Sequence, residues 1–293
     1  MSTYTGKILV TGASGQLGAL AIAALLKKVP ASQLIATARN PAKLADLAAR
    51  GVEVRQADYT QPASLEAAFQ GVDRLLLISS SEVGQRLPQH RNAIEAAQRA
   101  RVKLLAYTSI LRADSTPLLL GEEHRQTEEL LRASGIPFVF LRNGWYSENY
   151  TGTLAGVLEH GAVLGSAGEG RLSTASRADY ADAAAAVLAS SDDPAGRIYE
   201  LAGDQGFTLG EYAAEVARQA HKPVVYQDLP EAEYKAVLVQ LGLPDAFAGI
   251  LAQSDAAAAQ GGLYDDSRQL SQLIGRPTTP IAESIAKAIA KLA

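Results

Sequence analysis

Short apolar runs of five to seven residues alternate with helix-length segments through the first half of this chain. In the segments between the runs, such as residues 92–100 and 123–134, apolar residues recur at three- and four-residue spacing, which is typical of an α-helix. Strands that alternate with helices are joined by right-handed crossovers, and these produce a parallel sheet covered on both faces. We therefore predict an α/β fold with a doubly wound parallel sheet. The predicted strands are residues 7–11, 34–38, 52–57, 74–79, 103–109 and 137–142.

The alternation weakens after the sixth predicted strand, where glycine, serine and alanine become frequent. Residues 197–203 still have the pattern of a strand, which we expect to return to the sheet. A helix is predicted after Thr208, whose hydroxyl can cap it, with Glu211 at the capping-box position. The sequence therefore predicts two interwoven parts. Residues 1–150 carry the parallel sheet, and residues 151–293 form a smaller, mostly helical lobe.

The composition excludes several classes of site and partner. The 293 residues include no cysteine, so disulfides, thiolate metal sites and thiol catalysis are excluded. The four histidines lie too far apart to suggest a metal pair on one helix, and the paired carboxylates Asp265 and Asp266 have no accompanying ligand cluster. We therefore expect no metal site. The formal net charge of -4, with lysine and arginine scattered along the chain, argues against nucleic acid as a partner.

The N-terminal sequence carries no sign of export or membrane insertion. No basic segment is followed by a long apolar one, and no apolar helical pattern is long enough to cross a bilayer. We therefore predict a cytoplasmic protein that is not inserted in a membrane.

The glycine motif TGASGQLG, residues 11–18, follows the first predicted strand and opens a helix. Gly12 permits a tight turn, Gly15 lets backbone N–H groups approach a pyrophosphate, and Gly18 lets the helix lie close to the sheet. An ordinary glycine-rich turn is the alternative, but the repeated strand–helix units favour a Rossmann-type dinucleotide site. The predicted contact residues are Gly12, Ala13, Ser14, Gly15, Gln16 and Leu17.

The end of the second predicted strand indicates which dinucleotide binds. Sites that prefer NAD place an acidic residue here to bind the ribose 2′-hydroxyl, whereas this chain has Arg39, with Lys43 in the next turn. A cation at this position can bind the 2′-phosphate of NADPH through charge-assisted hydrogen bonds. We predict a preference for NADP(H) over NAD(H) that does not exclude NAD(H). The alternative is that Arg39 is a solvated loop residue.

Two further strand ends complete the predicted cofactor groove. Asp58 follows the third strand, where its carboxylate can accept a hydrogen bond from the adenine amino group, or alternatively cap the next helix. Ser79, Ser80 and Ser81 follow the fourth strand, and their small side chains allow the ribose and nicotinamide to lie close. A serine-rich loop without this role is the alternative.

None of the eleven tyrosines has a lysine four residues later, so the Tyr-x-x-x-Lys pair of standard short-chain dehydrogenases is missing. Five segments in this order resemble the NmrA-like atypical short-chain dehydrogenase/reductase family, and within it the bacterial NAD(P)H:quinone oxidoreductases. The segments are TGASGQLG, LLLISSSEVGQRLPQHRN, LRNGWYSENY, TASRADYA and IGRPTTP.

The resemblance implies two-electron reduction of quinones by NADPH, by direct hydride transfer without flavin or metal, on a Rossmann domain with a mostly helical C-terminal lobe. In such reductases a lysine often heads the helix before the sixth strand, four residues ahead of a glutamate. This chain has His124 there, with Glu128 following. A near-neutral imidazole of His124 could donate to a quinone oxygen. The alternative is a surface histidine.

The resemblance also directs attention to the turn after the sixth strand. The side-chain amide of Asn143 can donate to a developing quinol oxygen, or alternatively cap the next helix. Trp145, Tyr146 and Tyr150 would form flat walls for a flat acceptor, or alternatively a cluster that stabilises the fold. The predicted cofactor contacts in this segment are Gly144, Trp145, Tyr146, Ser147, Glu148 and Asn149.

Arg177 and Asp179 are interpreted as organising the start of an alanine-rich helix, with Asp179 as its N-cap. The alternative is that this segment contacts the cofactor or substrate. NmrA-like proteins also include NADP-binding redox sensors that act through a protein partner, and this remains the alternative function. The sequence does not decide between a monomer and a homodimer.

Overall fold

The structure is a computed structural model that describes residues 4–292. The chain divides into two compact units, each assembled from several stretches of sequence. Unit 1 contains the residues up to Ala113, residues 123–143 and residues 177–199, and the remaining residues form unit 2. The predicted boundary at residue 150 lies shortly after the chain leaves unit 1. A single division there leaves out the return of residues 177–199 to unit 1.

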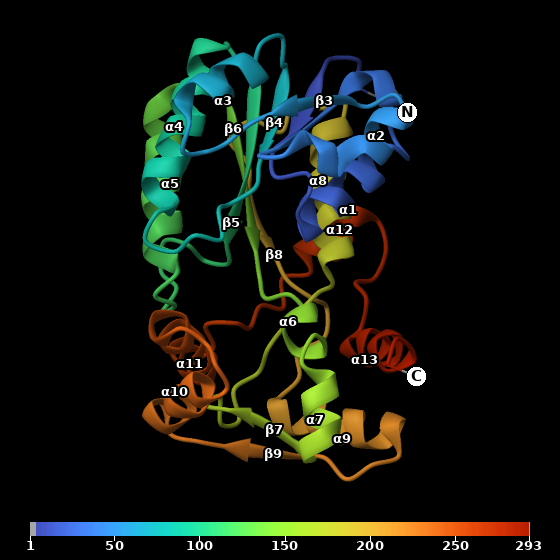
Figure 1. Cartoon of the computed structure of the whole chain (residues 1–293), viewed down its shortest axis with the longest axis vertical. Coiled ribbons are helices and arrows are strands. Elements are labelled where there is room, and N and C mark those ends of the chain that lie inside the picture. Colours follow the sequence, from blue (N-terminus) through green and yellow to red (C-terminus); the bar gives the residue numbers. More distant parts are fainter. Residues whose placement is uncertain (1–3, 293) are drawn as a thin grey trace. The chain divides into compact units, whose positions relative to one another are not determined.

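A seven-stranded sheet has the strand order β3-β2-β1-β4-β5-β6-β8, and the strands from β1 to β6 pair in parallel (Figure 1). The chain builds outward from β1 to β3 and then returns to β4. The order therefore reverses between β1 and β4, where doubly wound sheets bind ligands. The predicted strands and the Rossmann-type fold are confirmed. The strands are β1 (Ile8–Val10), β2 (Leu34–Ala38), β3 (Glu53–Gln56), β4 (Arg74–Leu77), β5 (Leu104–Ile110), β6 (Phe138–Asn143) and β8 (Ile198–Leu201).

Helices cover both faces of the sheet in unit 1. Figure 1 shows α1 and α8 packed together on one face, and α3, α4 and α5 on the other. The central strands β1, β2, β4, β5 and β6 are buried, whereas the edge strands β3 and β8 are partly exposed. Apolar side chains of the central strands meet those of the helices, with Leu9, Phe69 and Phe140 in one core cluster. The helices of this unit are α1 (Gln16–Leu25), α2 (Ala45–Ala49), α3 (Pro62–Ala68), α4 (Arg86–Arg99), α5 (Gly121–Ser134) and α8 (Arg177–Ala189), with short 3-10 turns at Ala31–Gln33 and Pro41–Leu44.

The start of α8 corrects one prediction. The helix begins at Arg177, so Asp179 lies inside its first turn and is not the N-cap. Asp179 is fully buried. A carboxylate in the first helical turn still interacts favourably with the helix dipole, and this explains why the sequence resembles a cap.

Unit 2 contains seven helices and a small parallel sheet of β7 and β9 among the described residues. The predicted capping box is confirmed, because the Thr208 hydroxyl accepts from Glu211 N at 3.1 Å and the Glu211 carboxylate accepts from Thr208 N at 2.9 Å. The strand β7 was not predicted. These elements are β7 (Ala162–Gly165), β9 (Val225–Asp228), α6 (Glu148–Thr151), α7 (Leu154–His160), α9 (Leu209–Ala220), α10 (Glu231–Gln240), α11 (Asp245–Ala259), α12 (Gln269–Ile274) and α13 (Ile281–Ala290).

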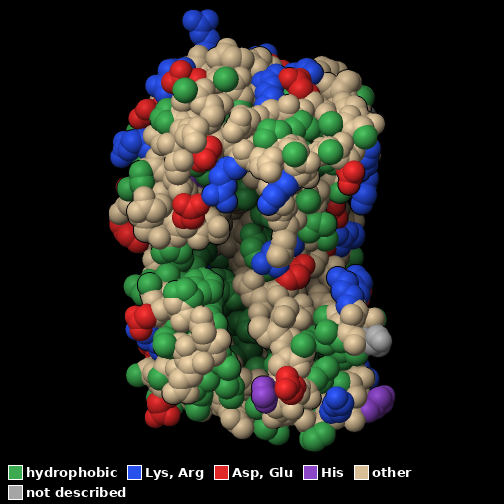
Figure 2. Space-filling model, in the orientation of Figure 1, with side chains coloured by type: hydrophobic (Ala, Val, Ile, Leu, Met, Phe, Trp, Pro, Cys, Tyr) green, Lys and Arg blue, Asp and Glu red, His purple; other side chains and the backbone are tan. Residues whose placement is uncertain are grey.

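Three features of the structure concern the partners that the sequence argues against, which are nucleic acid, a membrane and a metal ion. Lysine and arginine side chains are interspersed with aspartate and glutamate on the face drawn in Figure 2. Within residues 4–292, no helix is both long enough and apolar enough to cross a membrane. In the same part of the chain, no three His, Asp or Glu side chains come together as ligands for a metal ion.

Candidate functional site

The glycine loop connects β1 to α1 and leaves the amino end of the helix open. Gly12 has a φ of +58°, a conformation that favours glycine, and its carbonyl oxygen accepts from Gly15 N at 2.9 Å. Gly15 occupies the N-cap position without a side-chain cap. The first N–H groups of α1 therefore have no side-chain acceptor at the cap, which makes this end suitable for an anion.

Gly18 lets α1 lie against the loop. A Cβ atom at Gly18 would stand 2.3 Å from the Gly12 carbonyl oxygen and 2.8 Å from Ala13 Cα. Both neighbours are backbone atoms of the loop itself. Any larger residue would therefore push the loop out of position.

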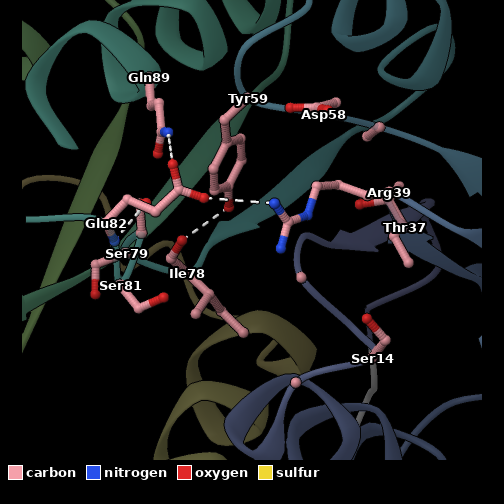
Figure 3. Close-up of a pocket in the computed structure, with 15 residues that line it drawn as sticks. Ser14, Thr37, Arg39, Asp58, Tyr59, Ile78, Ser79, Ser81, Glu82 and Gln89 are labelled. Carbon is pink, nitrogen blue, oxygen red and sulfur yellow. Dashed lines mark hydrogen bonds and ion pairs between the residues drawn. The ribbon is translucent and has the colours of Figure 1, made fainter. Parts of the chain in front are cut away.

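A cavity of about 260 Å³ in unit 1 lies beside this loop (Figure 3). Its walls come from the residues that follow β1, β2, β3 and β4, at the point where the strand order reverses. This is the location expected for a dinucleotide in a doubly wound fold. The predicted contact residues that line it are Gly12, Ser14, Gly15, Arg39, Asp58, Ser79, Ser80 and Ser81.

Three predicted loop residues do not line the cavity. Ala13 and Leu17 are buried, and Gln16 is exposed as the first residue of α1. The Ala13 N–H already donates to the Thr37 carbonyl at 2.8 Å. The contacts predicted for Ala13, Gln16 and Leu17 stay predictions. Seven further residues line the cavity without having been predicted, which are Thr37, Ala38, Ala57, Tyr59, Ile78, Glu82 and Gln89.

Arg39 lies on the cavity wall with a side chain that is 75% exposed. Its Nη1 atom is 3.4 Å from a carboxylate oxygen of Glu82, which belongs to the loop between β4 and α4. Gln89 on α4 donates from Nε2 to the other oxygen of the same carboxylate at 2.7 Å. The cavity thus has, beside the predicted Arg39 and Asp58, a second acidic residue that contacts Arg39.

Asp58 forms a turn at the end of β3. One carboxylate oxygen accepts from Thr60 N at 2.8 Å and from the Thr60 hydroxyl at 2.7 Å. The N-cap of α3 is Gln61, so the alternative interpretation of Asp58 as the helix cap is wrong. The predicted contact with adenine stays a prediction.

Tyr59 connects three strand ends behind the cavity. Its hydroxyl lies 2.6 Å from the Thr11 hydroxyl and donates to the Ile78 carbonyl at 2.7 Å. The Thr11 hydroxyl in turn donates to the Leu76 carbonyl. Burial raises the pKa of Tyr59 far above its usual value, so the hydroxyl keeps its proton. Its role is to hold the ends of β1 and β4 together.

The serine loop after β4 is held through its backbone. Ser80 donates from N to His90 Nε2 at 3.0 Å, and its carbonyl accepts from Arg86 Nε at 2.9 Å. The Ser80 hydroxyl accepts from Glu82 N at 3.2 Å. Ser79 N donates to the Thr108 hydroxyl at 2.8 Å. The Ser80 hydroxyl is therefore already used within the loop, although the residue lines the cavity.

A buried ion pair fixes the same loop to α5. Arg86 Nη1 is 3.1 Å from the Glu123 carboxylate, which also accepts from Gly84 N at 3.0 Å. The Arg86 side chain is 7% exposed, so this pair lies in a low-dielectric environment. The conformation of the loop is consequently set by residues on α4 and α5.

His90 has a defined protonation state. Because Nε2 accepts the Ser80 N–H, the ring proton lies on Nδ1, which is 3.0 Å from the Thr127 hydroxyl. Burial, with a smaller contribution from Arg86, lowers the pKa of His90 to about 3. His90 is therefore a neutral structural residue at physiological pH.

His124 differs from its predicted state. It is 5% exposed and its Nδ1 lies 2.7 Å from the Tyr107 hydroxyl, and it does not line the cavity described above. Burial, then Arg86 and His90, lower the pKa of His124 well below its usual value. The prediction of an imidazole with a near-neutral pKa is wrong, and so is the alternative of a surface histidine, because the His124 side chain is buried. A Tyr107 hydroxyl that donates to Nδ1 leaves the ring proton on Nε2.

Asn143 ends β6 with an unused side-chain acceptor. The residue is 6% exposed, and its Oδ1 atom is buried without a hydrogen-bond partner among the described residues. The N-cap of the next helix, α6, is Ser147, so the alternative of Asn143 as that cap is wrong. A buried polar atom without a partner is costly, which favours a ligand contact at Asn143.

The segment after Asn143 belongs to unit 2 and does not line the cavity. Gly144 donates from N to the Leu201 carbonyl at 2.7 Å. Ser147 is fully buried with its hydroxyl 2.9 Å from that of Thr174. Trp145, Tyr146 and Glu148 are half-buried and Asn149 is exposed. The cofactor contacts predicted for Gly144, Trp145, Tyr146, Ser147, Glu148 and Asn149 stay predictions.

Tyr150 lies in an aromatic cluster of unit 2. Its ring is 6.3 Å from that of Phe207 and 5.7 Å from that of Tyr212, measured between centroids. Its hydroxyl is buried without a partner among the described residues. The packing favours the fold-stabilising role that the sequence left open for Tyr150.

Residues 12–191 match a family described as NAD(P)H-binding. The chain belongs to this family. It is also similar to quinone oxidoreductase 2 of Escherichia coli (strain K12), with 56% identity over 278 residues that cover 95% of this chain and 97% of that protein. The family predicted from the five segments is confirmed.

Two solved structures of reductases are similar to this protein in fold and in sequence. The NADPH-dependent quinone oxidoreductase of Escherichia coli, complexed with NADPH, matches with a TM-score of 0.94 and 55% identity over 96% of this chain and 99% of the other. The triphenylmethane reductase of Citrobacter sp., complexed with NADP(H), matches with a TM-score of 0.91 and 40% identity over 96% and 100%.

Proposed function

We propose that this protein catalyses the two-electron reduction of quinones to hydroquinones by NADPH, without flavin or metal. The observation that carries the proposal is that the glycine loop and Arg39 line the same cavity. The open amino end of α1 suits the pyrophosphate, and the Arg39 guanidinium suits the 2′-phosphate. Similarity over nearly the whole length to a protein named quinone oxidoreductase 2 supports quinone as the acceptor.

The chain's own residues have a limited chemical task in this reaction. When bound, NADPH would supply a hydride. A quinone accepts a hydride readily, so the protein needs to hold it in place and give its oxygens hydrogen-bond donors. The missing Tyr-x-x-x-Lys pair is compatible with this task. Water would supply the second proton.

The cytoplasmic location remains a prediction.

Asn143 and His124 are the proposed donors. The Asn143 Oδ1 atom has no partner among the described residues, which supports a ligand contact at this side chain, and its Nδ2 group would be the donor to the quinone. An amide N–H can stabilise negative charge that develops on a quinone oxygen. His124 is neutral, and with the Tyr107 hydroxyl donating to Nδ1 its Nε2–H would donate a hydrogen bond to the quinone. This role for His124 stays a prediction.

The proposed reaction predicts quinone-dependent oxidation of NADPH. Steady-state loss of NADPH absorbance should be measured with and without a panel of benzoquinones and naphthoquinones, using protein free of flavin. We expect at least one quinone to accelerate the oxidation with saturable kinetics. Tight NADPH binding without any quinone-dependent oxidation would contradict the proposal and support a redox sensor that acts through a protein partner.

Asn143→Ala is expected to lower kcat with saturating NADPH by about tenfold, because a donor to the reacting oxygen is lost. The Kd for NADPH should change little. Kinetics at saturating NADPH and a thermal unfolding curve check the two effects separately. A kcat within twofold of wild type would remove Asn143 from the reaction.

A further inference from the structure

The Glu82 carboxylate places a negative charge beside the residue proposed to bind the 2′-phosphate. Figure 3 shows Arg39 extending from one wall of the cavity toward Glu82 on the other. The two residues are 43 positions apart in sequence, and Arg39 Nη1 lies 3.4 Å from Glu82 Oε1. Both side chains line the cavity and both are largely exposed, at 75% and 48%.

Gln89 holds the carboxylate in this position. Its Nε2 atom donates to Glu82 Oε2 at 2.7 Å, so the two carboxylate oxygens contact two different partners. Gln89 is 5% exposed, and its Oε1 atom is buried without a partner among the described residues. The backbone of Glu82 is also fixed, because its N–H donates to the Ser80 hydroxyl. Glu82 is therefore positioned by its surroundings and is not a freely moving surface residue.

A 2′-phosphate and the Glu82 carboxylate compete for the same guanidinium. An exposed ion pair with a 3.4 Å separation is weak, whereas arginine binds phosphate with strong charge-assisted hydrogen bonds. NADPH can therefore take Arg39 away from Glu82. The carboxylate then remains in the cavity near the phosphate, and the two negative charges repel each other. NADH carries no 2′-phosphate, so neither effect opposes it.

We propose that Glu82 is a specificity residue of the cofactor site, whose carboxylate competes with the 2′-phosphate of NADPH for Arg39 and so moderates the preference for NADPH over NADH. Gln89 is a positioning residue that keeps Glu82 within reach of Arg39. The inference rests on the proposed use of NADPH. It extends that proposal, because selection between the cofactors depends on a loop residue after β4 as well as on the end of β2.

The test is Glu82→Gln, which keeps the size of the side chain and removes its charge. Kd values for NADPH and NADH should be measured by titration of nicotinamide fluorescence, without any quinone present. We expect Glu82→Gln to tighten NADPH binding about fivefold to tenfold and to leave NADH binding within twofold. Raising the salt concentration should reduce the difference between variant and wild type, because the charges are exposed.

A double-mutant cycle separates competition for Arg39 from a general change of charge. Arg39→Ala alone should weaken NADPH binding about tenfold to a hundredfold. In that background, the gain from Glu82→Gln should shrink to about twofold, since the contested guanidinium is gone. Gln89→Met should raise the NADPH-to-NADH preference in the wild-type background and leave it unchanged when combined with Glu82→Gln. A purely structural role for Gln89 would weaken both nucleotides equally in both backgrounds.

Two results would overturn the inference. An unchanged Kd for NADPH in Glu82→Gln would show that the carboxylate does not compete. Equal weakening of NADPH and NADH would show that Glu82 helps to hold the bound nucleotide. In both cases the proposed quinone reduction would stand, because wild-type protein would still bind NADPH. Wild-type protein that binds neither nucleotide would overturn both proposals.

Discussion

Gly18→Ala is expected to weaken NADPH binding about tenfold to a hundredfold and to lower the thermal stability. The physical reason is the absence of space at this position. An added Cβ would lie 2.3 Å from the Gly12 carbonyl oxygen, well inside van der Waals contact. Neither the backbone of Gly12 nor that of Ala13 can move aside without shifting the loop that faces the cavity. Fluorescence titration with NADPH and thermal unfolding measure the two effects.

Gly156→Ala is the matched control for this prediction. Gly156 is an exposed residue of α7, and a Cβ there would meet nothing within 4 Å. Alanine should therefore leave NADPH affinity unchanged and stabilise the protein by about 0.5–1 kcal/mol through helix propensity. NADPH affinity in Gly18→Ala within threefold of wild type would show that the loop tolerates displacement and that its position is not important for binding.

The centre of the parallel sheet could be predicted from sequence because strands β1, β2, β4, β5 and β6 are buried on both faces. Such strands are continuous apolar runs, and β2 occupies the predicted residues 34–38. The strand β7 has an alternating, half-buried pattern over only four residues and pairs with one other strand. A short alternating pattern next to glycine does not distinguish a strand from a loop. Periodicity therefore identified the large sheet and missed β7.

The cofactor cavity was only partly predictable, for a different reason. The glycine motif and Arg39 lie at positions that are fixed relative to the ends of β1 and β2, so their location follows from the strand order. Glu82 reaches Arg39 only because the loop after β4 has one particular conformation. That conformation depends on contacts of Ser80 with His90 and Arg86, which come from α4. Local sequence contains no information on such contacts between side chains and a distant backbone.

The state of His124 could not be predicted because it depends on burial. The amphipathic pattern of α5 is compatible with a surface position or with an inward one, and the structure places the ring inside at 5% exposure. A histidine in that environment loses its proton at a much lower pH than one in water. The presence of a histidine therefore predicted a hydrogen-bonding group at this position, but the sequence did not predict the protonation state of that group.

A buried carboxyl group in unit 2 makes the stability of the protein depend on pH. Asp255 on α11 is 8% exposed, and its Oδ2 atom accepts from Ser166 N at 3.1 Å. Burial, with a further contribution from the charge of Asp228, raises the pKa of Asp255 to about 6. In the unfolded chain an aspartate has a pKa of about 3.9, so the folded state binds this proton more tightly than the unfolded state does.

The sign of the effect follows from this difference. Protonation of Asp255 favours the folded state and so increases the free energy of unfolding. This stabilising contribution is fully present below about pH 4 and is lost as the pH rises through 6. The full contribution is about 2–3 kcal/mol, and about half of it is lost between pH 5 and pH 8. The surrounding tyrosines, Tyr150 and Tyr234 among them, keep their protons throughout this range because their pKa values are raised.

We therefore expect Asp255→Asn to change the free energy of unfolding more favourably at pH 8 than at pH 5. The difference between the two changes should be about 1–2 kcal/mol. The asparagine Oδ1 atom can still accept from Ser166 N, so the hydrogen bond is retained. Urea denaturation of wild type and variant at the two pH values measures the difference. The exposed Asp266→Asn serves as the control and should show no dependence on pH. Equal changes at pH 5 and pH 8 in Asp255→Asn would contradict the raised pKa, because a carboxyl that is ionised at both values contributes equally at both.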